Sequence, residues 1–219
     1  MKLFVIGAGG AGSWLIPQLV MLKIAPVVVV DKDVLELSNM NRQLFTLDDI
    51  GKTKADALKE RWGFSQVIPE WYRVGLIDHQ PEDIIFGCVD NHAGRRAILN
   101  ACDTYKCRAV IMGNGTINAD AYFYTPEWAG TKADPRVRYP EIELTEDGPL
   151  RAPGCTGPII EDTTPQTVIA NTSAVTLALQ LFWIWVMRSD EIASCKPSVP
   201  VEYALNDFAI KQTKLKELL

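Results

Sequence analysis

The side chains best suited to chemistry lie in one short polar stretch. DKDVLELSNMNRQ (residues 31–43) follows the apolar run VVVV (27–30) and brings carboxylate, amide and guanidinium groups together, with two lysines close behind. Carboxylates accept hydrogen bonds from hydroxyl groups, amides fix orientation, and cations neutralise phosphate charge. The stretch therefore predicts a site for a phosphorylated ligand. The members that would orient the ligand or meet its charge are Asn39, Asn41, Arg42, Gln43, Lys52 and Lys54.

A glycine-rich loop precedes this stretch. GAGGAG (residues 7–12) satisfies the spacing GxGxxG, directly after an apolar run and directly before a predicted helix. Glycines here permit close backbone approach to phosphate, whose charge suits a helix N-terminus. Asp31 ends the next predicted strand, where an acid holds a ribose hydroxyl. The agreement favours nucleotide binding over a purely structural turn, with contacts from Gly7, Gly9, Gly10 and Gly12.

The residues after Asp31 decide which nucleotide is favoured. A nicotinamide dinucleotide needs the same loop and acid, and its pyrophosphate is served by the loop alone. A triphosphate carries more charge and needs cations and donors that reach beyond the helix N-terminus. The polar stretch supplies both, so a triphosphate is favoured and an NAD-dependent oxidoreductase is the alternative.

Four segments carry a family resemblance. GAGGAGS, DKDVLELSNMNRQ, GKTKA and CVDNHAGRR occur in the order and spacing seen in ThiF/MoeB-type and ubiquitin-activating-enzyme-like adenylyltransferases. The chain resembles that family over residues 1–125. Its members bind MgATP and adenylate the C-terminal carboxylate of a ubiquitin-like or sulfur-carrier protein, releasing pyrophosphate. The resemblance implies ATP and Mg²⁺ as cofactors, such a carrier or a peptide as partner, and a homodimer.

The resemblance also implies a role for each matching position. Asp31 would hold the ribose, with Asp33 as a supporting acid, and Asp90 in CVDN matches the magnesium-associated aspartate. Arg42 and Lys54 would stabilise the charge that develops when a carboxylate attacks the α-phosphorus. The other positions assigned to nucleotide binding are Asn39, Asn41, Gln43, Lys52 and Asn91.

Some of these residues have a competing structural interpretation. A helix is predicted to begin directly after Asp90, so this residue could be the N-cap, or Asn91 and His92 could share that role. Arg42 and Lys54 could be solvated surface charges, as most basic residues are. Their place within the polar stretch favours function.

The cysteines and arginines depart from the family pattern. Family members hold zinc with two CxxC pairs, whereas these five cysteines form none, so no structural zinc is expected. The first predicted strand begins at Lys2, so the arginine that MoeB-like relatives contribute from a preceding segment has no counterpart. Either catalysis is weakened, or another arginine substitutes, with Arg95, Arg136, Arg138 and Arg151 as the candidates.

Cys155 is a further candidate catalytic residue. It lies in RAPGCTGP, ahead of a late helix, where some relatives form a thioester or disulfide with the carrier. Cys88 falls in a predicted strand and Cys102 in a predicted helix, so both are expected to be small core residues.

Strands that alternate with helices must position these groups. Strands are predicted at residues 2–6, 27–30, 66–74, 83–89, 108–115, 119–125 and 201–207, and helices at 14–23, 51–63, 91–106 and 168–187. Continuous apolar strands of this kind predict a parallel sheet covered on both faces. The expected fold is Rossmann-like, doubly wound α/β, with a mostly parallel sheet and an antiparallel C-terminal part.

The chain is expected to form one domain over residues 1–219. Its parts are a nucleotide-binding half (1–125), a crossover loop without periodicity (126–165), and a C-terminal helix and strand (166–219). A length of this order suffices for one substantial core.

Bulk properties exclude several classes of partner. The net charge of −5 gives no global basic field for nucleic acid or anionic membrane. MKLFVIGAG is too short an apolar run for a signal peptide, and the cysteine pattern fits a reducing compartment, so a cytoplasmic location is expected. Residues 168–187 could span a bilayer, but their polar members favour a buried or subunit-interface helix.

Three functions remain to be separated. The favoured one is an ATP-dependent enzyme that activates a carrier or peptide C-terminus. The others are an NAD-dependent oxidoreductase and a binding module that keeps the nucleotide without turnover.

Overall fold

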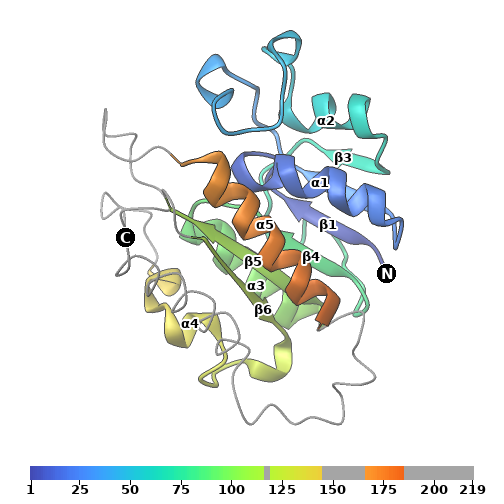
Figure 1. The fold of residues 1–219 in the computed structure, drawn as a ribbon. Coiled ribbons are helices and arrows are strands. Elements are labelled where there is room, and N and C mark those ends of the chain that lie inside the picture. The colour runs from blue at the N-terminus through green and yellow to red at the C-terminus, as the bar shows by residue number, and fades with distance from the viewer. Residues whose placement is uncertain (116–118, 145–165, 185–219) are drawn as a thin grey trace, which may run out of the picture.

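A six-stranded sheet forms the centre of the computed structural model, which describes residues 1–115, 119–144 and 166–184 (Figure 1). The strands are β1 Leu3–Ile6, β2 Val27–Val30, β3 Gln66–Ile68, β4 Ile84–Gly87, β5 Arg108–Asn114 and β6 Ala119–Tyr124. Their order is β3-β2-β1-β4-β5-β6. The first five strands pair in parallel, and β6 pairs antiparallel with β5. The predicted fold class is confirmed.

Helices cover both faces of this sheet. The longer ones are α1 Gly10–Leu22, α2 Lys54–Trp62, α3 His92–Tyr105 and α5 Val168–Phe182. α1 and α5 pack against each other on one face, and α3 covers the other face (Figure 1). Because the helices that follow β1 and β4 lie on opposite faces, the sheet is doubly wound.

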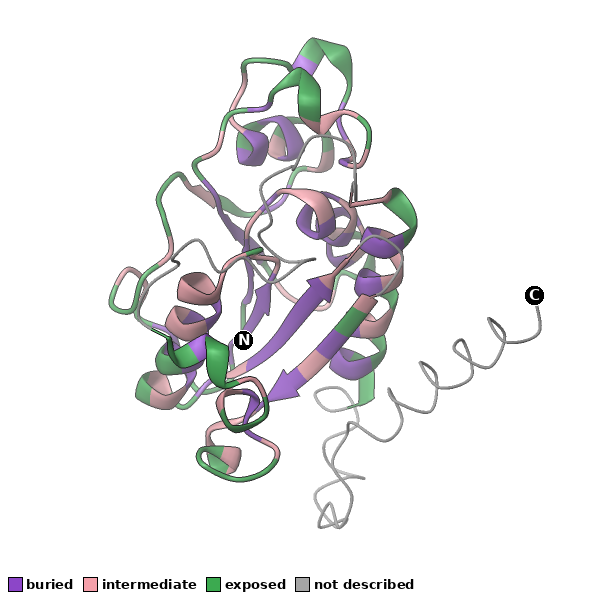
Figure 2. Ribbon diagram, turned by 90° about the vertical axis from the view of Figure 1, so that its left-hand side faces the viewer, coloured by how far each residue is buried: buried purple, intermediate pink, exposed green. Residues whose placement is uncertain are grey.

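The alternation of side chains along each strand explains these two layers. In β1, Leu3 and Val5 join the core beneath α1 and α5, whereas Phe4 and Ile6 join the core beneath α3. All four residues are buried, as are the central strands in Figure 2. Burying an aliphatic side chain of this size contributes about 1.5–3 kcal/mol, so both faces of the sheet favour folding.

Local signals account for most element ends. The Thr53 hydroxyl accepts a hydrogen bond from the Asp56 N–H (3.2 Å) at the start of α2, and Gly63 ends this helix with a φ of +65°. β3 stops at Ile68 because Pro69 has no N–H for a sheet ladder. α1 begins at Gly10, earlier than predicted, because the glycine loop itself forms the first turn.

The described part of the predicted crossover loop contains three short helices. They are η3 Pro126–Trp128, α4 Pro135–Arg138 and η4 Pro140–Glu143. Each begins with proline, whose fixed φ suits a first helical turn. Elements of three or four residues are too short to show a helical period, which explains why the sequence pattern is uninformative here.

Arg136 fastens this segment to the sheet and to α3. Its guanidinium donates to Asp103 (2.7 Å), to Asp134 (3.0 Å) and to the Tyr124 hydroxyl (2.5 Å). The Tyr124 hydroxyl in turn donates to Asp103 (2.5 Å). These bonds fix the position of α4.

Several expectations for the C-terminal part fall beyond the described residues. These are the predicted strand 201–207, Cys155 and Arg151. Within the ranges that the structure describes, no helix is long and apolar enough to cross a membrane. α5 instead buries Ala174, Ala178 and Phe182 against the sheet.

Candidate functional site

The predicted site residues gather at the carboxyl ends of three neighbouring strands. The glycine loop follows β1, Asp31 follows β2, and Asp90 comes shortly after β4. The helices after β1 and β4 leave toward opposite faces, so the winding of the sheet reverses between these two strands. Ligands of doubly wound proteins bind at such a point.

Two glycines of the loop are required by the packing of the chain itself. Gly7 has a φ of +96°, and a Cβ there would lie 2.8 Å from the Cys88 carbonyl oxygen. A Cβ at Gly12 would lie 1.9 Å from the Gly7 carbonyl oxygen. Any side chain at either position would therefore displace the loop from β4 or α1 from the loop.

Gly9 and Gly10 face different surroundings. A Cβ at Gly10 would meet the Asn171 amide at 2.9 Å, whereas a Cβ at Gly9 would have Gln43 Nε2, 3.8 Å away, as its nearest contact. Gly9 is also the N-cap of α1, which has no side-chain cap and no acidic residue in its first turn. Uncapped backbone N–H groups at a helix start suit an anion such as phosphate.

Asp31 is buried beside the glycine loop and bonded to the backbone on both sides. Its carboxylate accepts hydrogen bonds from the Ala8 N–H (2.6 Å) and the Asp33 N–H (2.7 Å). Burial raises the pKa of the Asp31 carboxyl above its ordinary value, although these two N–H groups act to lower it. Each oxygen retains a lone pair, so the carboxylate can accept from a hydroxyl of a ligand.

Lys54 brings a buried cation to the same place. Its Nζ lies 2.9 Å from Asp33, and its backbone N–H donates to the Asp33 carbonyl (2.8 Å). Its side chain is 10% exposed, whereas that of Asp33 is 41% exposed. The first turn of α2 thus positions Lys54 next to the end of β2, and the surface-charge interpretation of this lysine is not what the structure shows.

Gln43 places a buried amide against the glycine loop. The residue is 8% exposed, and its Oε1 is buried without a hydrogen-bond partner among the described residues. Leaving an amide oxygen in this state costs about 1–3 kcal/mol. A half-turn of the amide exchanges its donor and acceptor ends, so Gln43 can serve either kind of ligand atom.

Three side chains anchor the backbone around this glutamine. Trp14 Nε1 and Asn171 Nδ2 both donate to the Arg42 carbonyl oxygen, each at 3.1 Å. The Leu44 N–H donates to the Ser13 hydroxyl at 3.0 Å. The peptide groups on both sides of position 43 are therefore held by α1 and α5.

These anchors are functional candidates that sequence reasoning missed. Ser13 and Trp14 belong to a helix defined by its apolar pattern, and Asn171 lies 129 residues from its partner Arg42. The polar residues in the first half of the predicted apolar helix were the available signal for Asn171. Nothing local in the sequence connects that helix with the polar stretch.

The remaining members of the polar stretch bond to one another near the surface. Arg42 Nη1 donates to the Ser38 carbonyl (2.8 Å) and to Asn41 Oδ1 (2.9 Å). Asn39 Oδ1 accepts from the Glu36 N–H (3.1 Å) and closes the turn η1 Leu37–Asn39. The structure does not bring these side chains to the glycine loop.

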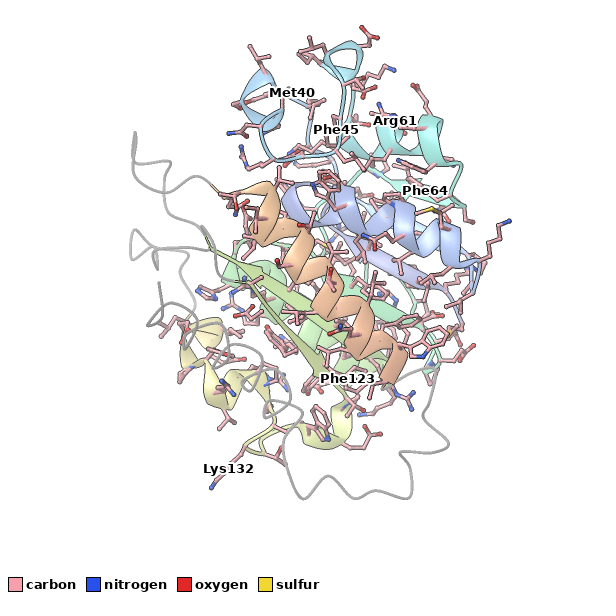
Figure 3. The ribbon with its side chains drawn as sticks, in the orientation of Figure 1. Met40, Phe45, Arg61, Phe64, Phe123 and Lys132 are labelled. Carbon is pink, nitrogen blue, oxygen red and sulfur yellow. The ribbon has the colours of Figure 1, made fainter. Side chains whose placement is uncertain are left out.

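Lys52 likewise points to a neighbouring helix. Its Nζ lies 2.7 Å from Glu60 on α2 and 3.8 Å from Asp49. Arg61, also on α2, donates to Asp49 (2.5 Å) and to the Leu44 carbonyl (3.2 Å), and it lies near Phe45 at this end of the molecule (Figure 3). These bonds tie the outer part of the loop to α2.

Asp90 and Asn91 divide the two roles that the sequence left open. Asn91 is the N-cap of α3, with its Oδ1 accepting from the Gly94 N–H (2.7 Å). Asp90 is exposed, and its carboxylate accepts from Asn91 Nδ2 at 3.4 Å. The capping alternative for Asp90 is therefore wrong, and its carboxylate is available to a cation.

Two of the described cysteines, Cys102 and Cys107, lie in the core, and Cys88 packs against it. Cys102 and Cys107 are buried with their Sγ atoms 3.8 Å apart, and burial raises the pKa of the Cys88 thiol. Cys88 lies directly after β4 rather than inside it. In the ranges that the structure describes, no cluster of three or more His, Cys, Asp or Glu side chains could hold a metal ion.

The arginines considered as substitutes occupy different places. Arg136 is engaged in the bonds that hold α4. Arg95 is buried in the first turn of α3, and its charge acts to lower the pKa of the Asp120 carboxyl against the larger effect of burial. Arg138 lies over the Tyr139 ring, 5.2 Å from its centroid.

The strand order, the glycine loop between β1 and α1, and the acid after β2 define a Rossmann-like α/β protein. The family model described as the ThiF family matches residues 1–149 of the 219. The chain therefore belongs to the ThiF family, which confirms the resemblance seen in its motifs.

Curated relatives have similar sequences over about half of this chain. The ubiquitin-like modifier-activating enzyme 5 of Drosophila ananassae is 32% identical over 119 residues, which are 45% of this chain and 30% of the relative. The enzyme of the same name from Dictyostelium discoideum is 30% identical over 124 residues, or 47% and 32% of the two chains. The chain thus matches about a third of the length of these relatives.

Solved structures share the fold over most of the chain. TcdA (CsdL) has a TM-score of 0.63 at 18% identity and covers 87% of both chains. The E. coli tRNA N6-threonylcarbamoyladenosine dehydratase TcdA, solved in complex with ATP, has a TM-score of 0.61 at 18% identity with the same coverage. PaaA has a TM-score of 0.58 at 18% identity and covers 85% of this chain and 64% of its own.

Proposed function

We propose that this chain binds MgATP at the carboxyl edge of its sheet and adenylates a carboxylate. The substrate we propose is the C-terminus of a ubiquitin-like protein, a sulfur-carrier protein or a peptide. Membership of the ThiF family and relatives named as ubiquitin-like modifier-activating enzymes support this class of reaction. A solved TcdA structure in complex with ATP supports the choice of nucleotide.

The observation that carries the proposal is the buried amide of Gln43 beside Gly9 at the start of α1. Its unpaired Oε1 and the uncapped helix N-terminus lie close together, with Asp31 after β2 and Lys54 in the first turn of α2. Together they offer acceptors for hydroxyl groups, donors for phosphate oxygens and one buried positive charge. This set fits a nucleotide with more than one phosphate.

The proposed step is a substitution at the α-phosphorus. An oxygen of the carboxylate attacks that phosphorus, the bond to the oxygen bridging to the β-phosphate breaks, and pyrophosphate leaves with the electron pair. Two anions approach each other, so the protein must position them and neutralise charge. Lys54 and the α1 N-terminus do this from fixed positions, and we assign Arg42 the same task once its guanidinium turns to the phosphates.

Asp90 is the residue we propose for Mg²⁺. A hard cation that bridges phosphates needs one or two protein carboxylates, and an exposed aspartate at the end of β4 fits that requirement. Bound there, Mg²⁺ would neutralise phosphate charge. Asn39, Asn41, Lys52 and Asn91 stay in the proposal as nucleotide-binding residues on the family resemblance alone.

Three further parts of the proposal rest on the family resemblance or on composition. They are a homodimer, a cytoplasmic location, and transfer of the activated carboxylate to Cys155. Exposed apolar side chains on α5, including Ile169 and Trp183, support association between copies. Sedimentation that shows only monomers at micromolar concentration would remove the homodimer.

An exchange assay tests the reaction. The protein is incubated with ATP, Mg²⁺, radiolabelled pyrophosphate and a set of small carrier proteins that end in Gly-Gly. Label is expected in ATP with at least one carrier, and none is expected with the same carrier amidated at its C-terminus. Nicotinamide reduction without exchange would instead support the oxidoreductase alternative, and MgATP binding without exchange would support the inert binding module.

A further inference from the structure

We infer that Asn171 and Trp14 are positioning residues for Gln43, acting through the carbonyl group of Arg42. This inference rests on the proposed nucleotide site, because it assigns Gln43 a contact with the bound ligand. Neither Asn171 nor Trp14 is expected to touch the nucleotide.

The carbonyl of Arg42 is the point on which both residues act. It belongs to the peptide group that joins Arg42 to Gln43, and it accepts from Trp14 Nε1 and from Asn171 Nδ2 at 3.1 Å each. The next peptide group is held from the other side, by the Ser13 hydroxyl at 3.0 Å from its N–H. A residue whose two flanking peptide planes are fixed has its Cα–Cβ direction fixed as well.

The side chain of Gln43 is thereby directed toward the glycine loop. Gln43 Nε2 is the nearest atom to a Cβ built on Gly9, at 3.8 Å, and Gln43 Oε1 is buried without a partner among the described residues. Holding an unsatisfied buried amide in place requires compensation from surrounding bonds. The bonds to the Arg42 carbonyl supply it.

Asn171 is itself held so that the Nδ2 end of its amide faces the Arg42 carbonyl. The residue is fully buried, and its Oδ1 accepts a hydrogen bond from Asn114 Nδ2 at the end of β5. That bond orients the Nδ2 end toward the Arg42 carbonyl. The same amide lies against Gly10, where a Cβ would approach it to 2.9 Å.

Four separate elements therefore meet at one asparagine. They are the start of α1, the loop ahead of α2, the end of β5 and the first turn of α5. The side chain is short enough to fit beside a helical glycine and has both a donor and an acceptor. A buried, fully bonded amide of this kind specifies the relative position of the parts that it joins.

The test is a double-mutant cycle on MgATP affinity, measured by titration calorimetry on the full chain. Asn171→Ala is expected to weaken MgATP binding about tenfold in the wild-type background, the scale of one lost hydrogen-bond network. In a Gln43→Ala background the same substitution is expected to change affinity less than about twofold, because the residue it positions is gone. A role confined to stability would lower the melting temperature and leave the two effects on affinity additive.

A matched control and a milder variant complete the test. Thr172→Ala alters the neighbouring polar residue of α5 and should leave affinity unchanged. Within the described part of the chain, its hydroxyl bonds only to the Val168 and Ile169 carbonyls of its own helix. If Asn171→Ala does not fold, Trp14→Phe removes one bond to the same carbonyl and keeps the ring. It is expected to weaken binding about threefold, with the same dependence on Gln43.

The outcomes separate this inference from the proposed function. Wild-type protein that binds MgATP, with additive effects of the Asn171 or Trp14 variants and Gln43→Ala, would overturn the positioning role alone. Wild-type protein that binds no MgATP would overturn both. Non-additive losses together with an unaffected Thr172→Ala variant support the inference.

Discussion

The side chains of the polar stretch (residues 31–43) and the lysines after it fall into two groups, one buried and one at the surface. Asp31 and Gln43, followed by Lys54, are buried near the glycine loop, whereas Asn41 is exposed and bonds to Arg42 at the surface. The buried residues hold their geometry before any ligand arrives, so little ordering entropy opposes binding through them. Under the proposed function, the surface residues must exchange their present bonds for bonds to phosphate. Burial thus separates residues that are already in place from residues that respond to the ligand.

Removing the buried cation is expected to have the largest effect. Lys54→Ala should lower the rate of ATP–pyrophosphate exchange by about 10²–10³, because a fixed charge in a site shielded from water contributes more than one in solvent. Lys59→Ala, on the same helix with its Nζ bonded to the Ser65 carbonyl, should leave the rate within a factor of about two. Equal losses of exchange rate in Lys54→Ala and Lys59→Ala would show that burial does not distinguish the two lysines.

Arg42 tests whether the surface residues of the polar stretch respond to the ligand. Arg42→Ala should lower the exchange rate about 100-fold while leaving the melting temperature unchanged, because among the described residues the guanidinium bonds only to the neighbouring Ser38 and Asn41. Arg73→Ala removes an exposed arginine paired with Glu70 and serves as the control in both assays. A melting temperature that falls by several degrees in Arg42→Ala would show that this arginine is structural.

The pH dependence of stability tests whether Asp31 is as enclosed as the structure shows. Burial raises the pKa of this carboxyl in the folded state from its ordinary value of 3.8, so the folded state binds the proton more readily than the unfolded state does. Its contribution to stability is therefore fully present below the unfolded pKa and is lost as the pH rises through the folded pKa. Urea unfolding of wild-type protein and of Asp31→Asn should diverge with increasing pH above that ordinary value, in favour of the variant.

A pH-independent difference between Asp31→Asn and wild-type protein would contradict that expectation. It would mean that the N–H groups of Ala8 and Asp33 fully offset the burial of the carboxylate. Asp31 would then be enclosed, but its charge would not lower the stability of the folded state.

Lys52 should give the smallest effect. Lys52→Ala is expected to change MgATP affinity less than about threefold, because its ammonium is paired with Glu60 in solvent. Glu60→Ala frees the same lysine and provides the matched measurement by calorimetry. A loss beyond tenfold in Lys52→Ala alone would place this residue among those that move to the nucleotide, as the family resemblance suggests.

Much of the fold follows from patterns local in the sequence. The apolar run of β2 and the closing Gly63 each act within a few residues, and the structure agrees with both. The helix predicted from residue 51 begins instead at Lys54, after the cap at Thr53. The position of Asp31 beside the glycine loop also follows, because parallel strands end at one edge of a sheet.

The remainder depends on contacts that no local pattern encodes. Asn171 reaches the Arg42 carbonyl across 129 residues, and the amide of Gln43 gains its direction from that bond. The guanidinium of Arg42 forms hydrogen bonds with neighbouring residues, and no sequence pattern predicts these bonds. The short helices between Pro126 and Glu143 escape detection because they lack a full period.

The shortness of β3 has a consequence for how copies of this chain can associate. This edge strand contributes three residues and is cut off by Pro69, so it exposes few unpaired peptide groups. A second molecule would find almost no template there for continuing the sheet by intermolecular strand addition. Self-association by strand addition is therefore disfavoured at that margin, and so is fibrous growth from it.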